Sequence, residues 1–185
     1  MGHPDGELMC RWRRGDANAA AELVERWQQP LARFLLRFAG RPDRVQDLCQ
    51  EVFLRVMRAA PRYRESGRFS TWLFQIALNV ARDAARRNRG GAAPLLEEPR
   101  GADATPLADA CDHELAKAVG RAFAELPPPQ REVLGLRHDA GMSFEEMARV
   151  LHTPASTLKS RFTAALYRLR SRLAELGWDF EETYP

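Results

Sequence analysis

Apolar side chains recur every three or four positions along most of this 185-residue chain, and the alternation expected of β-strands is nearly absent. A period of three to four residues places apolar groups on one face of an α-helix. The pattern therefore predicts an all-α fold, with helices near residues 16–38, 43–58, 68–87, 114–126, 129–138, 143–151 and 154–173.

Residues that commonly cap helices stand at several of these boundaries. Asp16 can cap the first helix, and Ser143 and Glu146 have the spacing of a capping box. Thr153 can cap the last helix, with Pro154 at its first position. These signals fix where we expect the helices to begin.

The helical period is lost at residues 89–112, which are rich in Gly, Pro and acidic residues. Such a composition is typical of a flexible linker. We therefore expect two small helical domains, at residues 8–88 and 113–174, followed by an acidic tail at 175–185. Fully extended, the linker would span at most about 80 Å, so the two domains could occupy well-separated sites on DNA.

The outward face of the helix that begins near Asp43 has an apolar centre in a charged surround. Leu54 lies there among Asp47, Glu51 and Arg55. Glu51 and Arg55 are four residues apart, so the face is equally well explained as a solvated ion-pair surface. An apolar centre with a polar rim is also the anatomy of a protein docking surface. The residues alone leave both interpretations open.

The helix at residues 68–87 has an aromatic end and a selective polar stripe. Its apolar residues repeat at core spacing, so the aromatic side chains are more simply explained as core than as base-stacking groups. Asn and Asp can bond base edges and Arg can contact phosphates. The stripe is a candidate nucleic-acid surface formed by Thr71, Gln75, Asn79, Arg82, Asp83 and Arg86.

The segment from Ser143 onward has the form of a helix-turn-helix, in which a short capped helix and a tight turn precede a longer basic helix. The second helix of this motif reads the major groove with its N-terminal residues. The residues expected to face DNA are Ser156, Thr157, Lys159, Ser160 and Arg161.

The charge is distributed in blocks, although the net charge is only +3. Residues 1–91 carry +7, residues 92–125 carry −4, residues 126–173 carry +4 and residues 174–185 carry −4. Two basic blocks on either side of an acidic one suit a polyanion that is bound at two places. Solvated helix faces would account for the same charges.

Several function classes find no support in the sequence. No apolar run approaches the roughly 18–20 residues of a membrane span, so we expect no membrane insertion. The three cysteines are widely spaced, which indicates free thiols and a reducing, cytoplasmic location. Cys111 and His113 are too few for a zinc site. With no catalytic constellation and no phosphate-binding loop, we expect neither an enzyme nor a cofactor.

Four motifs, taken in order, resemble the bacterial sigma-70 factors, and specifically the small extracytoplasmic-function (ECF) group that keeps only two domains. They are DLCQEVFLRV (47–56), RFSTWLFQIALNVARDAARR (68–87), ELPPPQREVLGL (125–136) and MSFEEMARVLHTPASTLKSR (142–161). The resemblance covers nearly the whole chain. It implies that residues 8–88 correspond to sigma region 2 and residues 113–174 to sigma region 4.

The resemblance also implies partners for each surface. Core RNA polymerase would be bound at its β′ clamp helices by Asp47, Gln50, Glu51, Leu54 and Arg55. The melted −10 element would be bound, as a single strand, by Arg64, Arg68, Ser70, Asn79, Asp83, Arg86 and Arg87. Region 4 would read the duplex −35 element with the helix-turn-helix residues and contact the β flap. Sigma factors of this group are commonly inhibited by an anti-sigma factor.

Two other functions compete with this one. A helix-turn-helix regulator would bind duplex DNA without polymerase, and a purified sample would then give sequence-specific footprints by itself. An enzyme such as a nuclease would use the scattered His and Asp residues, although these lack ligand spacing.

Overall fold

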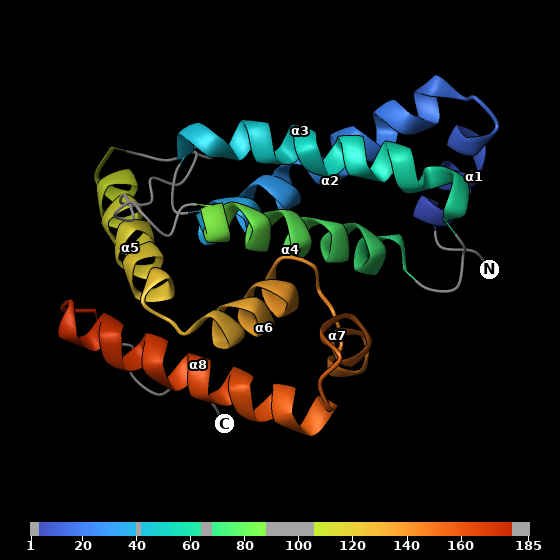
Figure 1. The fold of residues 1–185 in the computed structure, drawn as a ribbon. Helices are drawn as coiled ribbons and strands as arrows, with labels where there is room; N and C mark the ends of the chain where they lie inside the picture. Colours follow the sequence, from blue (N-terminus) through green and yellow to red (C-terminus); the bar gives the residue numbers. More distant parts are fainter. Residues whose placement is uncertain (1–3, 40–41, 64–67, 88–105, 179–185) are drawn as a thin grey trace.

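The computed structural model describes residues 4–39, 42–63, 68–87 and 106–178. Within these ranges the chain is helical and contains no strand, which confirms the all-α prediction. The elements are α1 (Pro4–Arg13), α2 (Ala17–Ala39), α3 (Pro42–Ala59), the short 3-10 helix η1 (Ala60–Arg62), α4 (Phe69–Arg87), α5 (Pro106–Ala124), α6 (Pro128–His138), α7 (Phe144–Leu151) and α8 (Ala155–Glu175) (Figure 1). Arg64, most of the expected linker and the end of the acidic tail lie outside the described residues.

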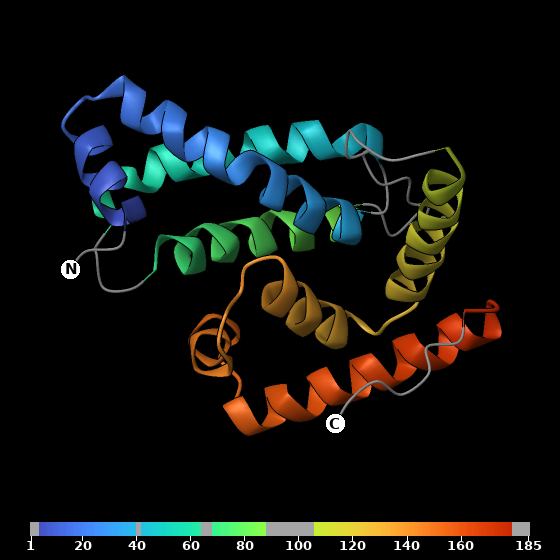
Figure 2. The same cartoon turned by 180° about the vertical axis from the view of Figure 1, so that it is seen from behind.

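The N-terminal half is a bundle in which α2, α3 and α4 run alongside one another, with α1 at one end (Figure 2). Its interior is rich in aromatic rings: Phe34 and Phe74 are fully buried and meet edge to face, with ring centroids 5.2 Å apart. Trp27 also meets the Phe74 ring edge to face. Each buried ring removes a large apolar area from water, so these contacts anchor the bundle.

The predicted caps are confirmed at two of three helices. Asp16 accepts hydrogen bonds from the backbone N–H groups of Asn18 and Ala19, at 3.0 and 3.3 Å. Ser143 and Glu146 form the complete capping box, with bonds of 3.1 and 2.8 Å. The prediction for Thr153 is wrong. Its hydroxyl donates instead to the Leu151 carbonyl, and Pro154 occupies the N-cap of α8.

Helix α1 was not predicted from the sequence. Leu8 and Met9 bury its inner side against the bundle, and the buried carboxylate of Asp5 pairs with Arg26 of α2 at 2.5 Å. A ten-residue helix with few apolar positions gives a weak periodic signal, so packing on α2 decides its structure. Helix α5 likewise begins earlier than expected, at Pro106 rather than near Glu114.

The two halves of the chain share one hydrophobic core, although the sequence suggested separate domains. Helix α6 lies against α2 and helix α7 against α4, on the side of α4 opposite α3 (Figures 1 and 2). Val133 and Leu136 of α6, with Met142 and Met147, are fully buried in the cluster that contains the N-terminal core. Leu134 points the other way, toward α8. Helix α6 is therefore packed on two sides, and one of them belongs to the other half.

Gly135 allows this close approach. A Cβ atom at that position would lie 3.0 Å from Cε2 of Phe38 and 3.3 Å from Cε2 of Phe34. Both rings belong to α2, so the missing side chain lets α6 contact the N-terminal bundle directly. We call this arrangement, with the C-terminal half packed on α2 and α4, the closed arrangement.

Candidate nucleic-acid interface

The outer face of α3 is open to solvent and lies away from the C-terminal half (Figure 1). Asp47, Gln50 and Leu54 are exposed, and Leu54 leaves 45% of its surface in water. Met57, one turn farther on, is 55% exposed and was not singled out from the sequence. Leu54 and Met57 together give this face a larger apolar centre than the sequence suggested. The α3 face comprises Asp47, Gln50, Glu51, Leu54, Arg55 and Met57.

An ion-pair chain connects the α3 face to α4. Arg55 donates to Glu51 at 2.7 Å and to Asp83 at 3.3 Å, and Asp83 also accepts from Arg86. The bond to Glu51, with a smaller contribution from Asp83, raises the pKa of Arg55 above its ordinary value. The i,i+4 pair that the sequence allowed is therefore present. The link from α3 to Asp83 is additional, because only the fold brings the two helices together.

Most of the predicted strand-binding residues lie on the accessible side of α4. Asn79, Arg86 and Arg87 are exposed and Asp83 is half-buried. Arg68, just before the helix, is exposed as well. Ser70 is a correction: it is 1% exposed, so the structure places it in the interior rather than on the strand-facing side. One residue in the first turn of α4 thus faces the core while its predicted neighbours face solvent.

The aromatic end of α4 belongs to the interior, as the sequence indicated. Phe69 is buried, and Trp72 is half-buried against Tyr63, with ring centroids 4.9 Å apart. Trp27 also packs against Phe69, with ring centroids 6.3 Å apart. These contacts hold the start of α4 in place and leave its polar stripe to face outward.

The helix-turn-helix forms as predicted from α7, a tight turn and α8. His152 ends α7 in the left-handed conformation, with φ of 50°. Ser156, Thr157, Lys159 and Ser160 are exposed along the first turns of α8, while Arg161 is half-buried. The Ser160 hydroxyl donates to the Ser156 carbonyl at 3.1 Å, and the Lys159 ammonium lies 5.8 Å from the centre of the Phe144 ring.

The C-terminal half contacts one edge of the α4 stripe through polar groups. Two guanidinium nitrogens of Arg82 donate to the two carboxylate oxygens of Glu132, each at 2.7 Å. The Thr71 hydroxyl donates to Glu146 at 3.1 Å, and Arg68 donates to the Gly141 carbonyl at 3.3 Å. The sequence identified the stripe but gave no sign that acidic residues about 50 to 75 positions later would lie opposite it.

Two pKa shifts describe the electrostatics near these surfaces. Burial by itself raises the pKa of Glu146, but hydrogen bonds from the Ser143 N–H and hydroxyl and from Thr71 outweigh it, and the net pKa is lowered. Burial raises the pKa of the Cys49 thiol on α3 to about 11. At neutral pH, Glu146 is therefore a carboxylate and Cys49 a neutral thiol.

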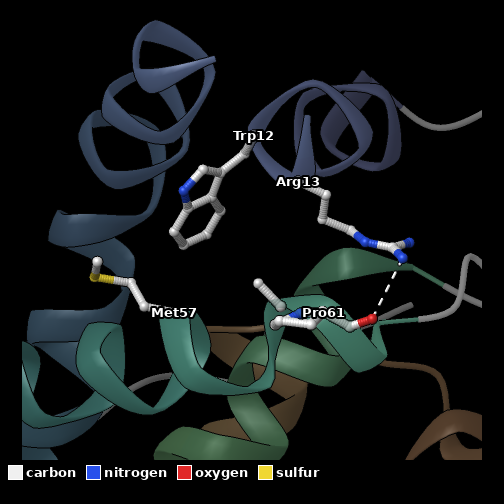
Figure 3. Close-up of a pocket in the computed structure, with 5 residues that line it drawn as sticks. Trp12, Arg13, Met57 and Pro61 are labelled. Carbon is white, nitrogen blue, oxygen red and sulfur yellow. Dashed lines mark hydrogen bonds between the residues drawn. The ribbon is translucent and has the colours of Figure 1, made fainter. Parts of the chain in front are cut away.

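A pocket of about 270 Å³ lies between α1 and the end of α3 (Figure 3). Trp12 and Arg13 line it from α1, and Met57, Ala60 and Pro61 from the opposite side. Arg13 donates to the Pro61 carbonyl at 3.3 Å, which closes one side of the pocket. Met57 belongs both to this pocket and to the α3 face, so the pocket adjoins the apolar end of that face.

The described ranges contain no group of three or more His, Cys, Asp or Glu side chains placed to hold a metal ion. Among the helices in those ranges, none is both long and apolar enough to cross a membrane.

Comparisons with known proteins match a different family description to each half of the chain. The family described as "Sigma-70 region 2" matches residues 23–90, and the family described as "Sigma-70, region 4" matches residues 116–169. RNA polymerase sigma factor CarQ of Myxococcus xanthus is 33% identical over 168 residues, which cover 91% of this chain and 97% of CarQ. RNA polymerase sigma-H factor of Pseudomonas aeruginosa is 31% identical over 172 residues, with 87% and 89% covered.

Two solved structures have a similar fold. CnrH, determined in complex with the cytosolic domain of CnrY, superposes with a TM-score of 0.72 and 27% identity, covering 92% of this chain and 97% of CnrH. The sigma factor RpoE in complex with the anti-sigma factor NepR, from Bartonella quintana, has the same fold, with a TM-score of 0.67 and 21% identity over 83% of this chain and 97% of RpoE.

Proposed function

Because the chain belongs to the sigma-70 family, in its ECF group, it is an RNA polymerase sigma factor, and we propose how its surfaces divide the work of initiation. Members of this family are non-catalytic initiation factors. They bind core polymerase and direct it to the −10 and −35 elements of promoters. The alternative, a helix-turn-helix regulator that acts without polymerase, leaves the region 2 match at residues 23–90 without a role.

The α3 face docks on core polymerase in this proposal, with the clamp helices of β′ as its site. The single observation that carries the assignment is the exposed apolar centre formed by Leu54 and Met57, beside Asp47, Gln50 and Glu51. An apolar centre surrounded by polar groups is typical of protein interfaces. A solvated ion-pair surface does not require an apolar centre. The position of this face away from the C-terminal half leaves it accessible in the closed arrangement.

The stripe on α4 receives the −10 strand as it separates from its complement. Asn79 and Asp83 supply donors and acceptors for base edges, while Arg68, Arg86 and Arg87 supply positive charge for phosphates. Extracting a base from the stack costs a few kcal/mol, and contacts of this kind must compensate that cost. The neighbouring aromatic residues give the stripe a rigid support.

The helix-turn-helix reads the −35 element as intact duplex, with region 4 also contacting the β flap. Ser156, Thr157, Lys159 and Ser160 occupy the exposed first turns of α8, which is the part of the motif that enters the major groove. Arg161 adds a guanidinium at the edge of the same surface. Short hydroxyl side chains and long basic ones together suit both base edges and phosphates.

The test of the proposed function is run-off transcription with bacterial core polymerase. Templates selected from random sequence by the reconstituted holoenzyme supply the promoter. We expect transcripts that start at a fixed distance from two shared sequence elements, and none without this chain. Sequence-specific footprints from the free protein, with no transcription after core enzyme is added, would instead identify a regulator that acts without polymerase.

We further propose that an anti-sigma protein controls the chain. The support is the likeness to CnrH, which was determined in complex with the cytosolic domain of another protein. The product of the adjacent gene is the first candidate. Co-expression should yield a stable complex that no longer binds core polymerase, and undiminished core binding by the complex would contradict this assignment.

A further inference from the structure

The side of α8 that faces away from α6 is exposed and mixes apolar with basic groups (Figures 1 and 2). Leu166 and Tyr167 leave 46% and 74% of their surfaces in water. At about 100° per residue, they share a window of roughly 120° around the helix axis with exposed basic and hydroxyl side chains. The outer face of α8 comprises Lys159, Ser160, Thr163, Leu166, Tyr167 and Arg170. Two of its members, Lys159 and Ser160, are residues that we assign to the −35 element.

The chemistry of this face suits an acidic partner that also carries apolar side chains. Two neighbouring large apolar side chains beside charged groups are typical of a docking surface. The chain itself contains a matching segment at residues 179–185, the end of the acidic tail. This segment has three carboxylates, two aromatic side chains and no basic residue: Asp179, Phe180, Glu181, Glu182 and Tyr184.

The end of α8 brings the chain to the edge of this face. Gly177 has a φ of 87°, in the left-handed region, and the Trp178 N–H donates to the Leu173 carbonyl at 2.9 Å. This is the usual way in which a glycine ends a helix. Trp178 thereby folds back onto Leu173, with which it shares a hydrophobic cluster. Leu173 lies only about 20° from Leu166 around the helix axis, so residue 179 begins beside the outer face.

The segment is long enough to cover the face. With a rise of 1.5 Å per residue, Tyr167 lies about 9 Å and Lys159 about 21 Å from Leu173 along the axis of α8. Seven residues span at most about 25 Å when fully extended. Residues 179–185 can therefore reach the apolar pair easily and Lys159 when they are nearly extended.

We propose that the outer face of α8 is the docking surface for residues 179–185 of the same chain. The two aromatic side chains of the segment pack on Leu166 and Tyr167, and its carboxylates lie beside Arg170 and Lys159. The docked segment covers part of the surface that we assign to the −35 element, so it competes with duplex DNA. This inference rests on the proposed function of α8 and adds an occupant for its outer face.

Tethering makes even a weak contact of this kind effective. A segment joined to its own docking surface by a short connection has an effective concentration in the millimolar range. Carboxylates and DNA phosphates are both anions that basic side chains bind, so the segment and the duplex exclude each other at Lys159. The apparent affinity for DNA is then reduced to the fraction of molecules whose outer face is free.

Three variants separate docking from a simple effect of net charge. A chain that ends at Trp178 lacks the segment but keeps every residue that the structure describes. Phe180→Ser/Tyr184→Ser removes the apolar anchors and leaves all three carboxylates in place. The matched control, Phe180→Leu/Tyr184→Leu, changes the same positions but keeps their apolar character.

The first measurement is the binding of a short fluorescein-labelled DNA duplex of mixed sequence, by fluorescence anisotropy. We expect the chain that ends at Trp178 to bind about five- to tenfold more tightly than the native chain, and the serine variant about three- to fivefold. The leucine control should stay within about twofold of the native chain. The differences should shrink as salt is added, because salt screens exposed charges.

The second measurement locates the segment without DNA. A nitroxide label is attached at Thr183→Cys in a Cys10→Ser/Cys49→Ser/Cys111→Ser background. It should broaden the backbone amide NMR signals of Thr163, Leu166 and Tyr167. The broadening should be lost when Phe180→Ser/Tyr184→Ser is added.

Three results would overturn the proposal. They are broadening confined to other helices, broadening that appears only between a labelled and an unlabelled copy, and a serine variant that binds the duplex no more tightly than the native chain. The second would identify a contact between two copies, and the third an effect of net charge alone. Run-off transcription with core polymerase depends on none of these results, so their failure is distinct from a failure of the proposed function.

Discussion

Arg55 is the side chain that connects the two surfaces to which we assign docking and strand binding. It donates to Glu51 on its own helix and to Asp83 on α4, so a change at the α3 face also alters the charge near the residues that we assign to the −10 strand. Exposed ion pairs of this kind contribute little to stability, typically below about 1 kcal/mol. The network is therefore better placed to orient Asp83 and Glu51 than to hold the fold together.

Reversing the charge of Glu51 tests the α3 face directly. Glu51→Lys replaces the partner of Arg55 with a like charge on the surface that we assign to core polymerase. We expect core affinity to fall about tenfold or more, equivalent to ~1.4 kcal/mol, while far-UV circular dichroism stays native. The matched control is Glu114→Lys, which reverses an exposed acid on α5 that also pairs with a neighbour on its own helix. Equal losses in the two variants, or none, would remove α3 from the docking surface.

Cys49 gives a measurable sign of how tightly α3 packs. Because burial raises the pKa of its thiol from 9.0 to about 11, only about one hundredth of the usual thiolate is present at pH 8. In a Cys10→Ser/Cys111→Ser background, the rate of alkylation by iodoacetamide should keep rising with pH to about 11. In urea the same profile should level off near 9. A native profile that levels off near 9 would show that the thiol is accessible to water.

At the scale of single elements, the capping box is the feature that fixes where the recognition motif begins. Ser143→Ala removes the hydroxyl that accepts from the Glu146 N–H, and we expect a loss of about 1 kcal/mol in the free energy of unfolding, measured in urea. The control is Ser171→Ala, because Ser171 is exposed within α8 and Ala favours a helix interior. A loss no larger than that of the control would mean that α7 does not depend on its cap.

The same cap predicts a pH dependence. The pKa of Glu146 in the folded chain lies below the ordinary value of 4.5, so its stabilising effect is complete above pH 4.5. The effect is lost as the pH falls through the folded value, because the carboxylate then takes up a proton. The difference in unfolding free energy between the native chain and Glu146→Gln should therefore shrink below pH 4.5. A constant difference from pH 7 to pH 3 would contradict the assignment.

The sequence was sufficient for features that are decided within one helix. Periodicity located the long helices, and the short-range chemistry of Asp16 and of the Ser143–Glu146 pair located their starts. Thr153 misled, because its hydroxyl found a nearer acceptor in the Leu151 carbonyl. The expectation that Ser70 faces the DNA strand also failed, because Ser70 is buried. A small polar side chain in the first turn of a helix does not indicate whether it faces the core or the solvent.

At the scale of the whole molecule, sequence reasoning stopped at the contact between the halves. The pattern of an amphipathic helix indicates that one of its faces is buried, but it does not indicate which element covers that face. Val133 and Leu136 fit an isolated helix-turn-helix as well as they fit the shared core. Glu132 and Arg82, 50 residues apart, carry no mutual signal in one sequence. Long-range pairing of this kind depends on three-dimensional complementarity, which only the structure supplies.

Arg161 tests whether the two halves do separate tasks on one promoter. Arg161→Ala removes a guanidinium from the surface of α8 that we assign to the −35 element, and a lost contact of this kind costs about 1–3 kcal/mol. Run-off transcription from a promoter with both elements should therefore fall about tenfold. On a template whose −10 region is already unpaired and whose −35 element is scrambled, the variant should match the native chain, because α4 alone then makes the sequence-specific contacts. The control, Arg168→Ala, removes an exposed charge farther along the same helix and should leave both templates nearly unaffected. Equal losses on the two templates would mean that α8 acts through the fold or through the polymerase, and the division of labour between the halves would have to be abandoned.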